Sequence, residues 1–359
     1  MDTPKTPLKN LTFGELENIL LAEGEKKFRT TQVFKWLYQK RVDQFDQMTD
    51  MSKLLREKLE KKFSLSKLYP KYILESKFGD AVKFGFQLND SPYIIESVLL
   101  SDDKRRTACI SSQVGCALGC SFCETGKLGF IRNLTQGEIV GQIIGINDYL
   151  LSKSDRMVTN VVFMGMGEAL SNFSNFTRSL SVLMGAEAFN IGGRRITVST
   201  AGVVPSIERL IKEGLNIGLA ISLNAWNNEI RSQFMPINRR FPIEQLVSVS
   251  KRYFQKTGRR VTFEYILIRD LTDTIQAASK LEKMLGGFPC KINLIPLNNT
   301  GLENFEPTAD QKTIRFSEEL HRRGLAATIR KSRGRDIMGA CGQLTAFNNS
   351  DLQQKKETK

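Results

Sequence analysis

The chain of 359 residues is long enough for one large domain and an accessory one. Its 41% hydrophobic and 25% charged residues are typical of a globular protein, and no apolar run is long enough to span a bilayer. With 52 basic and 38 acidic residues the net charge is +14. This surplus favours a polyanionic partner, nucleic acid before membrane, although charge alone fits a generically basic soluble protein almost as well. The first residues contain no apolar signal-peptide core, so we expect a cytoplasmic protein whose reduced cysteines serve metal binding or catalysis.

Residues 1–68 are predicted to form a helical accessory domain. One amphipathic helix runs from about Phe13 toward Gly24, a second is expected to be capped by Thr30-Thr31, and a third begins near Ser52. The basic outer face of the third helix fits a solvated surface and RNA contact about equally well. Its basic residues are Lys53, Arg56, Lys58, Lys61 and Lys62.

Residues 69–100 change to a period of two, which predicts an antiparallel β element that links the helices to the rest of the chain. Glu96 falls inside one of these strands among apolar residues. An outward-facing position is the default for such a residue, whereas a buried carboxylate there would have to be paired or functional. The expected strands are 72–74, 82–86 and 93–98.

Residues 101–345 alternate strands with helices, which predicts parallel strands with helices outside them. Six such units fit an incomplete (β/α)6 barrel of the TIM type or an open doubly wound sheet, and in both the reactive groups belong at the carboxyl ends of the strands. Residues 346–359 are expected to be a polar C-terminal tail. The expected strands are 107–111, 160–164, 195–199, 218–223, 262–268 and 291–297, and the expected helices are 135–151, 172–184, 204–213, 243–257, 274–285 and 309–323.

Three cysteines, Cys116, Cys120 and Cys123, are spaced C-x3-C-x2-C, with Cys109 just upstream. Three thiolates in one short loop can hold three corners of a 4Fe–4S cluster and leave the fourth iron open, which is typical of a catalytic site. A structural zinc site would need a fourth ligand, and the single histidine, His321, is far downstream. The spacing resembles the signature of radical S-adenosylmethionine (SAM) enzymes, in which SAM chelates the open iron.

Polar residues follow the predicted strands. The string Met164-Gly165-Met166-Gly167-Glu168 follows the second strand, and its glycines let a ligand approach the backbone while Glu168 offers a carboxylate to a cationic amino group. Each of the other polar strand ends could be only a turn or helix cap, but together they are better explained as SAM contacts. The polar residues are Ser199, Ser222, Asn224 and Asn298, and Leu223 is included because it lies within the Ser222-Leu223-Asn224 stretch.

Cys341 lies beside glycine in a predicted loop near the C-terminus. A thiol becomes nucleophilic when it is partly exposed near positive charge, and Arg333 and Arg335 are candidates for that charge. An idle cysteine is the common alternative. Cys290 is interpreted that way.

These motifs together resemble the RlmN family, adenine C2-methyltransferases of 23S rRNA and tRNA, which is related to the Cfr C8-methyltransferases. The resemblance covers nearly the whole chain, including the helical N-terminus. It rests on the cysteine trio with a cysteine seven residues ahead of it, Met-Gly-Met-Gly-Glu, Ser-Thr-x-Gly-Val-Val-Pro, Met-Pro-Ile-Asn, Ile-Asn-Leu-Ile-Pro and a terminal Ala-Cys-Gly-Gln-Leu.

The resemblance implies that Cys116, Cys120 and Cys123 hold the 4Fe–4S cluster and that two SAM molecules are used per turnover. One SAM methylates Cys341, and the second yields a deoxyadenosyl radical that abstracts hydrogen from the S-methyl group. The methylene radical adds to adenine C2, and Cys109 then releases the product by forming a transient disulfide with Cys341. Glu96 matches the family's proton acceptor, a role that Cys109 could also take. Gly167 and Glu168 match the SAM-binding stretch.

Some positions depart from the family pattern. Asn224 stands where the family usually has histidine, and Ala169 stands where RlmN usually has proline and Cfr-type proteins have alanine. We favour C2 methylation, with C8 methylation as the nearest alternative. A non-catalytic RNA-binding iron–sulfur protein is a further alternative, which the presence of both Cys109 and Cys341 disfavours. A radical SAM enzyme acting on protein is another, which the basic surplus and the helical accessory domain disfavour.

The resemblance also implies the partners. They are 23S rRNA in the peptidyl transferase region, tRNA at the adenine beside the anticodon, and an electron donor such as flavodoxin or ferredoxin. A monomer without membrane association is expected.

Overall fold

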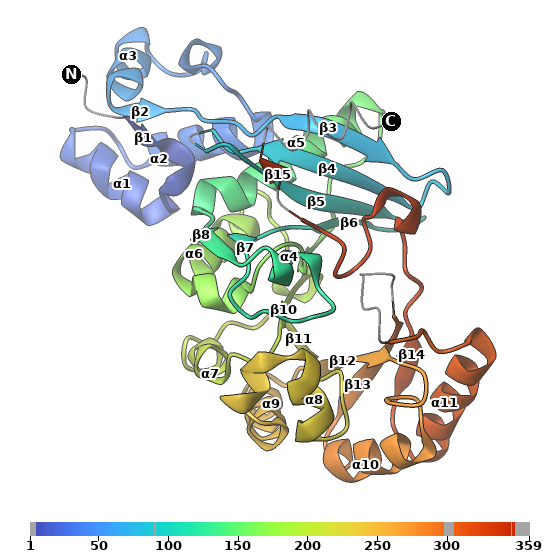
Figure 1. The fold of residues 1–359 in the computed structure, drawn as a ribbon. Helices are drawn as coiled ribbons and strands as arrows, with labels where there is room; N and C mark the ends of the chain where they lie inside the picture. The colour runs from blue at the N-terminus through green and yellow to red at the C-terminus, as the bar shows by residue number, and fades with distance from the viewer. Residues whose placement is uncertain (1–4, 90, 298–304, 346, 349–359) are drawn as a thin grey trace.

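The structure is a computed structural model that describes residues 5–89, 91–297, 305–345 and 347–348. Its centre is an 11-stranded sheet in this part of the chain, in the order β14-β13-β12-β11-β10-β9-β6-β5-β4-β3, with β15 paired to β5 (Figure 1). Neighbours from β6 to β14 are parallel, and neighbours from β3 to β6 are antiparallel. The strands are β3 Pro70–Glu75, β4 Ala81–Gln87, β5 Tyr93–Ser101, β6 Arg106–Cys109, β9 Asn160–Phe163, β10 Ile196–Thr200, β11 Gly218–Ser222, β12 Val261–Leu267, β13 Cys290–Pro296, β14 Ala327–Ile329 and β15 Phe347–Asn348.

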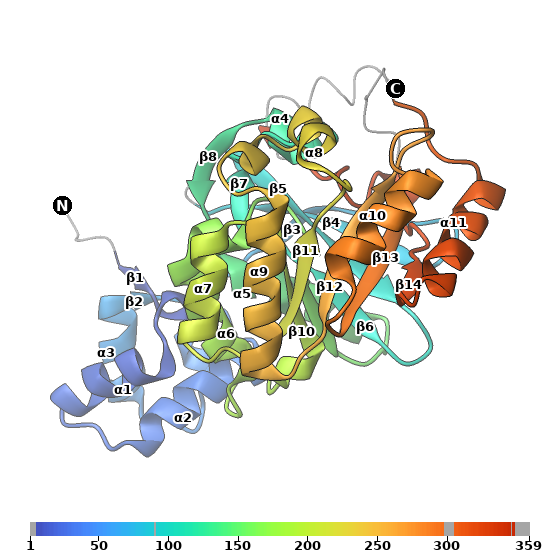
Figure 2. The ribbon, with the colours of Figure 1, turned by 90° about the horizontal axis from the view of Figure 1, so that it is seen from below.

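Helices follow the parallel strands and cover the outer side of the curved sheet (Figure 2). Their apolar stripes pack on strands such as β12, in which every residue except Thr262 is buried. The sheet order ends at β3 on one side and at β14 on the other, so the barrel is incomplete. The predicted partial (β/α)6 barrel is confirmed. The helices are α5 Gln136–Ser152, α6 Phe173–Met184, α7 Val204–Lys212, α8 Asn228–Phe234, α9 Ile243–Thr257, α10 Ile275–Leu285 and α11 Asp310–Arg322.

Two features of the sheet differ from the sequence expectation. Residues 69–100 were expected to link two parts of the chain, and their strands instead continue the barrel sheet because β5 pairs with β6. A further parallel strand, β14, follows the six expected ones and pairs with β13. It is only three residues long, and such a short segment has too little periodicity to be recognised.

The N-terminal part forms a helical unit beside the sheet (Figure 1). A capping box closes the start of α1, because Thr12 accepts from the amide of Glu15 and the Glu15 side chain accepts from the amide of Thr12. The second helix starts at Phe28, so the expected cap at Thr30-Thr31 was wrong, and Thr30 is buried inside the helix. The elements are β1 Thr6–Pro7, η1 Leu8–Asn10, α1 Phe13–Ala22, α2 Phe28–Phe34, the π-helix η2 Lys35–Lys40, η3 Phe45–Gln47, α3 Lys53–Lys62 and β2 Phe63–Ser64.

The helical unit shares one hydrophobic core with the barrel. The ring of Tyr38 lies 5.6 Å from that of Phe189. Arg178 on α6 pairs with Glu15 on α1. The side-chain nitrogen Nε2 of Gln136 donates to the backbone carbonyls of Lys9 and Leu11. The unit is therefore packed directly against α5 and α6. No helix in the described part of the chain is long and apolar enough to cross a membrane.

Candidate functional site

The three clustered cysteines lie in the long connection between β6 and α5. This connection contains a small antiparallel pair, β7 Gln113–Gly115 with β8 Phe130–Asn133, and the short helix α4 Glu124–Lys127. Gly115 has a φ of 74°, and a Cβ at this position would lie 1.8 Å from the carbonyl oxygen of Gly129. Only glycine allows this close backbone approach, which folds the loop back toward the barrel.

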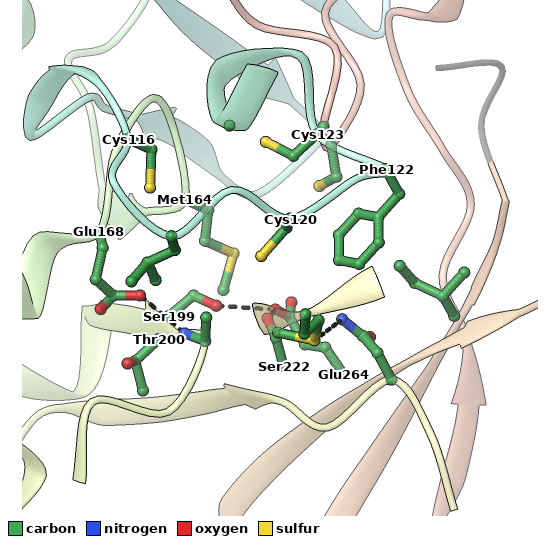
Figure 3. A pocket seen from close by; sticks show the side chains of 18 of the residues that line it. Cys116, Cys120, Phe122, Cys123, Met164, Glu168, Ser199, Thr200, Ser222 and Glu264 are labelled. Carbon is green, nitrogen blue, oxygen red and sulfur yellow. Dashed lines mark hydrogen bonds between the residues drawn. The ribbon is translucent and has the colours of Figure 1, made fainter. Parts of the chain in front are cut away.

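Cys116, Cys120 and Cys123 line one hollow at the carboxyl ends of the parallel strands, called the first hollow here. Figure 3 shows their thiols on one side of it, with Glu168, Ser199, Ser222 and Glu264 on the other. The predicted cysteine trio is thus brought together with most of the predicted strand-end residues. Further lining residues are Leu118, Phe122, Gly126, Phe163, Met164, Gly165, Gly167, Thr200, Ala201, Asn224, Met235, Ile266, Ile295, Pro296, Leu297, Cys341 and Gly342.

The arrangement of the trio is not that of a single-ion site. No three cysteine, histidine, aspartate or glutamate side chains in the described part of the chain converge closely enough to hold one metal ion. A cubane needs no such convergence, because each thiolate binds a different iron. Burial raises the pKa of Cys116 to about 12 and raises that of Cys120 further, with the neighbouring thiols adding to the effect at Cys120. Bound iron would supply the positive charge that three neighbouring thiolates require.

Glu168 is held at the rim of the first hollow by backbone amides. Its carboxylate accepts from the amides of Ala201, at 2.8 Å, and Leu170, at 3.3 Å. Burial raises its pKa to about 7. Gly167 before it has a φ of 90°, and a Cβ there would lie 2.4 Å from the side chain of Gln113. The carboxylate is buried and is held by backbone amides, so a ligand ammonium group would suit it.

Ser199 and Ser222 end neighbouring strands and both donate to Glu264. The Oγ–Oε2 distances are 2.9 Å from Ser199 and 3.4 Å from Ser222 (Figure 3). Glu264 is 7% exposed and lines the same hollow. The two hydroxyls and the carboxylate form a polar shelf opposite the thiols, and these groups can bind ribose hydroxyls.

Asn224 faces the first hollow with an unusual backbone and an unsatisfied oxygen. Its φ is 59°, in the left-handed region that asparagine tolerates better than most residues. Its Nδ2 donates to Met235 Sδ, whereas the buried Oδ1 has no hydrogen-bond partner among the described residues. A buried orphan oxygen at a ligand hollow is a plausible ligand contact, and the amide can take this place where the family usually has histidine.

Two other predicted SAM contacts, Leu223 and Asn298, are not seen among the described residues that line the first hollow. Leu223 is fully buried and is not among the residues that line the first hollow. Its carbonyl accepts from Arg231 Nε at 3.0 Å. Asn298 lies outside the described residues. Arg231 itself is fully buried and also bonds the carbonyls of Ala201 and Ser222, so it fixes the ends of β10 and β11 from behind.

A second hollow opens beside the first, between β5 and β6 on one side and β13 and β14 on the other. It is the larger, at about 740 Å³ against about 180 Å³. Cys109 and Cys341 both line it, and Cys341, Met164 and Ile295 line both hollows. Cys341 therefore stands in the wall between the cluster loop and the second hollow. The basic lining residues of the second hollow are Arg105, Arg330, Lys331 and Arg333.

The cation beside the two cysteines is Arg330. Burial raises the pKa of Cys109 to about 12 and raises that of Cys341, and the Arg330 guanidinium opposes both shifts. The expected source of charge was Arg333 or Arg335. Arg333 instead donates to the carbonyl of Ser101, and Arg335 is exposed, so this expectation is corrected. All six cysteines are thiols, with no disulfide among the described residues.

Glu96 is completely buried on β5 and is paired, contrary to the default of an outward-facing residue. Its Oε1 lies 2.9 Å from Lys83 Nζ and accepts from the Tyr72 hydroxyl at 2.6 Å. Its Oε2 accepts from the amide of Thr345 at 3.0 Å. The carboxylate therefore touches the segment that carries Cys341, although it lines neither hollow.

Sequence reasoning missed Glu264, Arg231 and Arg330. A signal existed for Glu264, which is a charged residue inside the apolar strand Val-Thr-Phe-Glu-Tyr-Ile-Leu, the same kind of signal that singled out Glu96. Arg330 follows a strand too short to be recognised, and nothing in the local sequence distinguishes Arg231 from a surface residue of α8.

Comparisons with known proteins agree with this geometry. Residues 6–65 match the family described as ribosomal RNA large subunit methyltransferase N-terminal domain, and residues 110–280 match the radical SAM superfamily. The chain is 42% identical to the dual-specificity RNA methyltransferase RlmN of Syntrophotalea carbinolica, over 94% of this chain and 89% of that protein. It is also 42% identical to a probable protein of the same name from Staphylococcus aureus, over 95% and 93% of the two chains.

A solved structure matches over nearly the whole fold. The crystal structure of a radical SAM methyltransferase from Sphaerobacter thermophilus superposes with a TM-score of 0.89 at 43% identity, covering 94% of this chain and 99% of that one. The residues at the first hollow suit the 4Fe–4S cluster and SAM that the superfamily uses, and the likeness extends through the helical N-terminal unit. The chain belongs to the RlmN family of radical SAM proteins.

Proposed function

We propose that the protein is a radical SAM methyltransferase that methylates C2 of adenine in RNA, through a methyl group carried on Cys341. The observation that carries the proposal is the position of Cys341. It lines both the hollow that contains the three clustered thiols and the hollow that contains Cys109. A sulfur in that wall can receive a methyl group on one side and present it to a base on the other.

RNA as the substrate is supported by the net charge of the protein and by the large basic hollow. The net charge is +14, and four basic residues line the larger hollow. Exposed Lys53, Lys58, Lys61 and Lys62 on α3 extend the basic surface onto the helical unit, for which we propose an RNA-contacting role. A protein must extrude a base or use an unpaired one to reach the edge of adenine, and an open basic hollow suits such a base. The relatives' dual specificity supports two kinds of RNA substrate, for which we propose 23S rRNA and tRNA.

The first hollow would hold the cofactors. Cys116, Cys120 and Cys123 would bind the cluster, and Gly167, Glu168, Ser199, Ser222 and Asn224 would hold SAM. We propose Asn298 and the backbone at Leu223 as further contacts, from the sequence. When bound, the cluster and SAM supply the methyl group and a carbon radical that activates it. The fixed side chains exclude water and hold the reacting carbon against Cys341.

Cys341 and Cys109 would complete the transfer. Once the methylene carbon on Cys341 is bonded to C2, the adduct would lose its one unpaired electron to an oxidant, for which the cluster held by Cys116, Cys120 and Cys123 is the candidate, and a base would remove the C2 proton. The thiolate of Cys109 then attacks the sulfur of Cys341, so that a sulfur–sulfur bond forms and the sulfur–carbon bond breaks, and the carbon takes the electron pair and a proton to become the methyl group. Arg330 beside both sulfurs favours the thiolate forms, since a nearby cation lowers the energy of a thiolate.

Glu96 is our candidate proton acceptor, and its contacts suggest a test. Glu96→Gln keeps an oxygen that can accept from the Thr345 amide but cannot take a proton, whereas Glu96→Ala removes both capacities. Because Lys83 would be left buried without its partner, each variant is paired with Lys83→Met. If Glu96 is the base, both pairs of variants lose the deprotonation step. If it only anchors the segment, the glutamine variant retains activity.

The proposal has two direct experiments. Mass spectrometry of 23S rRNA and tRNA from cells with and without the gene should show 2-methyladenosine disappearing. Loss of 8-methyladenosine with 2-methyladenosine unchanged would contradict the C2 assignment in favour of C8. In the second experiment, Cys109→Ala should trap the enzyme covalently on RNA, while Cys290→Ala, which alters a half-buried thiol outside both hollows, should not.

We further propose a cytoplasmic monomer that takes electrons from a small carrier such as flavodoxin or ferredoxin. Reduced carriers of these two kinds, supplied singly to the reconstituted enzyme, should each be compared by the rate of SAM cleavage. Gel filtration at two protein concentrations tests the oligomeric state.

A further inference from the structure

The segment 333–345, called the Cys341 segment here, crosses from the antiparallel strands to the cluster loop. Its ends are held by the bond from Arg333 to the Ser101 carbonyl and by the bond from the Thr345 amide to Glu96. Two further sets of contacts lie between these ends. The upstream set lies on the β3–β4 hairpin, where the Asp336 carboxylate accepts from the Ser76 hydroxyl and the Lys77 amide, both at 2.9 Å. Lys83 Nζ also donates to the carbonyl of Met338 at 3.3 Å. This set is distant from the cluster loop in the sequence and in its contacts.

The downstream set lies on α4. The amide of Glu124 donates to the carbonyl of Gly342 at 2.8 Å, and the Thr125 hydroxyl donates to the carbonyl of Leu344 at 2.5 Å. Thr125 is only 3% exposed, so its hydroxyl has no access to bulk water as a substitute partner. Cys341 lies directly before this set, so the position of its sulfur depends on α4.

Helix α4 in turn starts at a cluster cysteine. Cys123 is its N-cap, and the carbonyl of Cys123 accepts from the amides of Gly126 and Lys127 at 2.9 and 3.1 Å. The helix has four residues, and a helix that short does not persist without tertiary support. Its neighbours include Cys123 at the start, the Cys341 segment alongside, and the backbone of Cys120, which lies close against Gly126. Whatever holds these two cysteines therefore also supports α4.

We infer that Thr125 is a positioning residue that fastens the Cys341 segment to the cluster loop, so that binding of the cluster by Cys123 sets the position of Cys341. This inference rests on the proposed function. It assigns to α4 the role of holding the Cys341 segment in place. Without the cluster, Cys123 is released, α4 loosens, and the downstream half of the segment loosens with it. The upstream half stays on the β3–β4 hairpin.

Hydrogen exchange measured by mass spectrometry on the full chain tests the inference. Reconstituted and metal-free protein are compared for the wild type, Thr125→Val and Thr125→Ser. In the loaded protein, Thr125→Val should accelerate exchange at the amides of residues 124–127 and 343–345 by roughly 5- to 30-fold, the factor that corresponds to one lost contact of this kind. Thr125→Ser keeps the hydroxyl and should restore slow exchange. Metal removal from the wild type should accelerate the same amides.

The upstream half and a distant threonine serve as controls. The amide of Gly339, which donates to the carbonyl of Gly334 at 2.8 Å, should exchange at the same rate in every sample. Thr177→Val removes a hydroxyl on α6 that donates to the carbonyl of Ser174 and should change nothing near Cys341. In activity assays Thr125→Val should lower kcat for methyl transfer while KM for RNA stays constant, and Thr125→Ser should recover kcat.

Three results would overturn the inference. They are equal exchange in Thr125→Val and Thr125→Ser, equal exchange at residues 343–345 with and without metal, and an acceleration that spreads equally to Gly339. Iron and sulfide analysis of the same samples separates this inference from the proposed function. If no cluster forms, the proposed function fails, whereas the comparison of valine with serine in unloaded protein still reports on the fastening by Thr125.

Discussion

The two hollows share Cys341 but are lined by different kinds of residue. The first is lined mainly by polar groups that already have partners: Glu168 is held by amides, and Ser199 and Ser222 are held by Glu264. Behind it, Arg231 fixes two strand ends. The second is larger and basic, and two of its cations, Arg105 and Lys331, are exposed. Pre-arranged polar groups suit a small cofactor that must be held in one position, and an open basic surface suits a polyanion.

Cofactor binding in the first hollow and polyanion binding in the second are therefore separated within one barrel. The carboxyl ends of the parallel strands supply the rigid side, because strand ends are fixed by the ladder on both sides. The antiparallel extension and the Cys341 segment supply the other side. Each of the following changes should affect one hollow and spare the other.

The largest effect is expected for Cys120→Ala. Removing one of three thiolates leaves the cluster without a corner ligand, so iron and sulfide content and methylation should fall to background. RNA affinity, which depends on the second hollow, should stay at the wild-type value in a filter-binding assay. Loss of RNA binding together with the cluster would show that the two hollows are not independent.

The double variant Lys331→Gln, Arg333→Gln should weaken RNA binding. Each cation that contacts a phosphate contributes about one unit to the slope of log affinity against log salt, so the slope should fall by about two, with roughly tenfold weaker binding at moderate salt. SAM affinity should not change. Lys280→Gln, Lys283→Gln on the outer face of α10 is the matched control, and an equal loss there would mean that binding follows net charge alone.

Ser199→Ala should weaken SAM binding in the first hollow only, and the effect should be smaller than that of the two preceding variants. The variant removes one hydroxyl from the shelf on Glu264. We expect SAM affinity, measured by equilibrium dialysis, to fall by roughly five- to tenfold, since one net hydrogen bond contributes about 1 kcal/mol. RNA affinity should be the same as in the wild type. Unchanged SAM affinity would show that the shelf only ties β10 to β12.

The smallest effect is expected away from both hollows, at the Glu15–Arg178 pair that joins the helical unit to the barrel. The hydrogen bond from Arg178 lowers the pKa of Glu15 from 4.5 to about 2. A lowered pKa means that the pair stabilises the folded state above about pH 4.5 and that this contribution is lost as the pH falls toward 2. Because both side chains are partly exposed, the contribution is expected to be less than about 1 kcal/mol.

Glu15→Gln tests this by chemical denaturation. The variant should be slightly less stable than the wild type at pH 6, and the difference should shrink near pH 3. A difference that grows as the pH falls would have the wrong sign. Neither hollow should respond, so SAM and RNA affinities at pH 7 should remain at wild-type values.

Much of the fold was predictable because the periodicity of the barrel is local. The strands β9 to β13 and the helices α6, α7, α9, α10 and α11 begin and end within two residues of the expected positions, because their hydrophobic periods lie in consecutive residues. The seven-residue helix α8 was not predicted. The cysteine spacing likewise lies in one short loop. The start of α2 was predicted wrongly because Thr30 and Thr31 favour caps in general, whereas burial of Thr30 decided otherwise here.

The candidate site was only partly predictable. Asn224, Ser199 and Ser222 could be named from their places after strands, but their partner Glu264 lies on another strand, and Arg330 follows a three-residue strand. Sequence order says nothing about which side chains meet across a barrel. For the same reason the partners of Glu96, which are Lys83 and Tyr72, could not be predicted from the sequence.

The sequence by itself determined the alternating fold, the thiol trio and the family, because these depend on residue spacing along the chain. Only the tertiary structure decided that Cys341 stands between two hollows, that Arg330 rather than Arg333 or Arg335 is the cation beside it, and that α4 holds its segment. The physical reason is that these are contacts between residues up to about 220 positions apart, such as Thr125 and Leu344, which packing alone brings together.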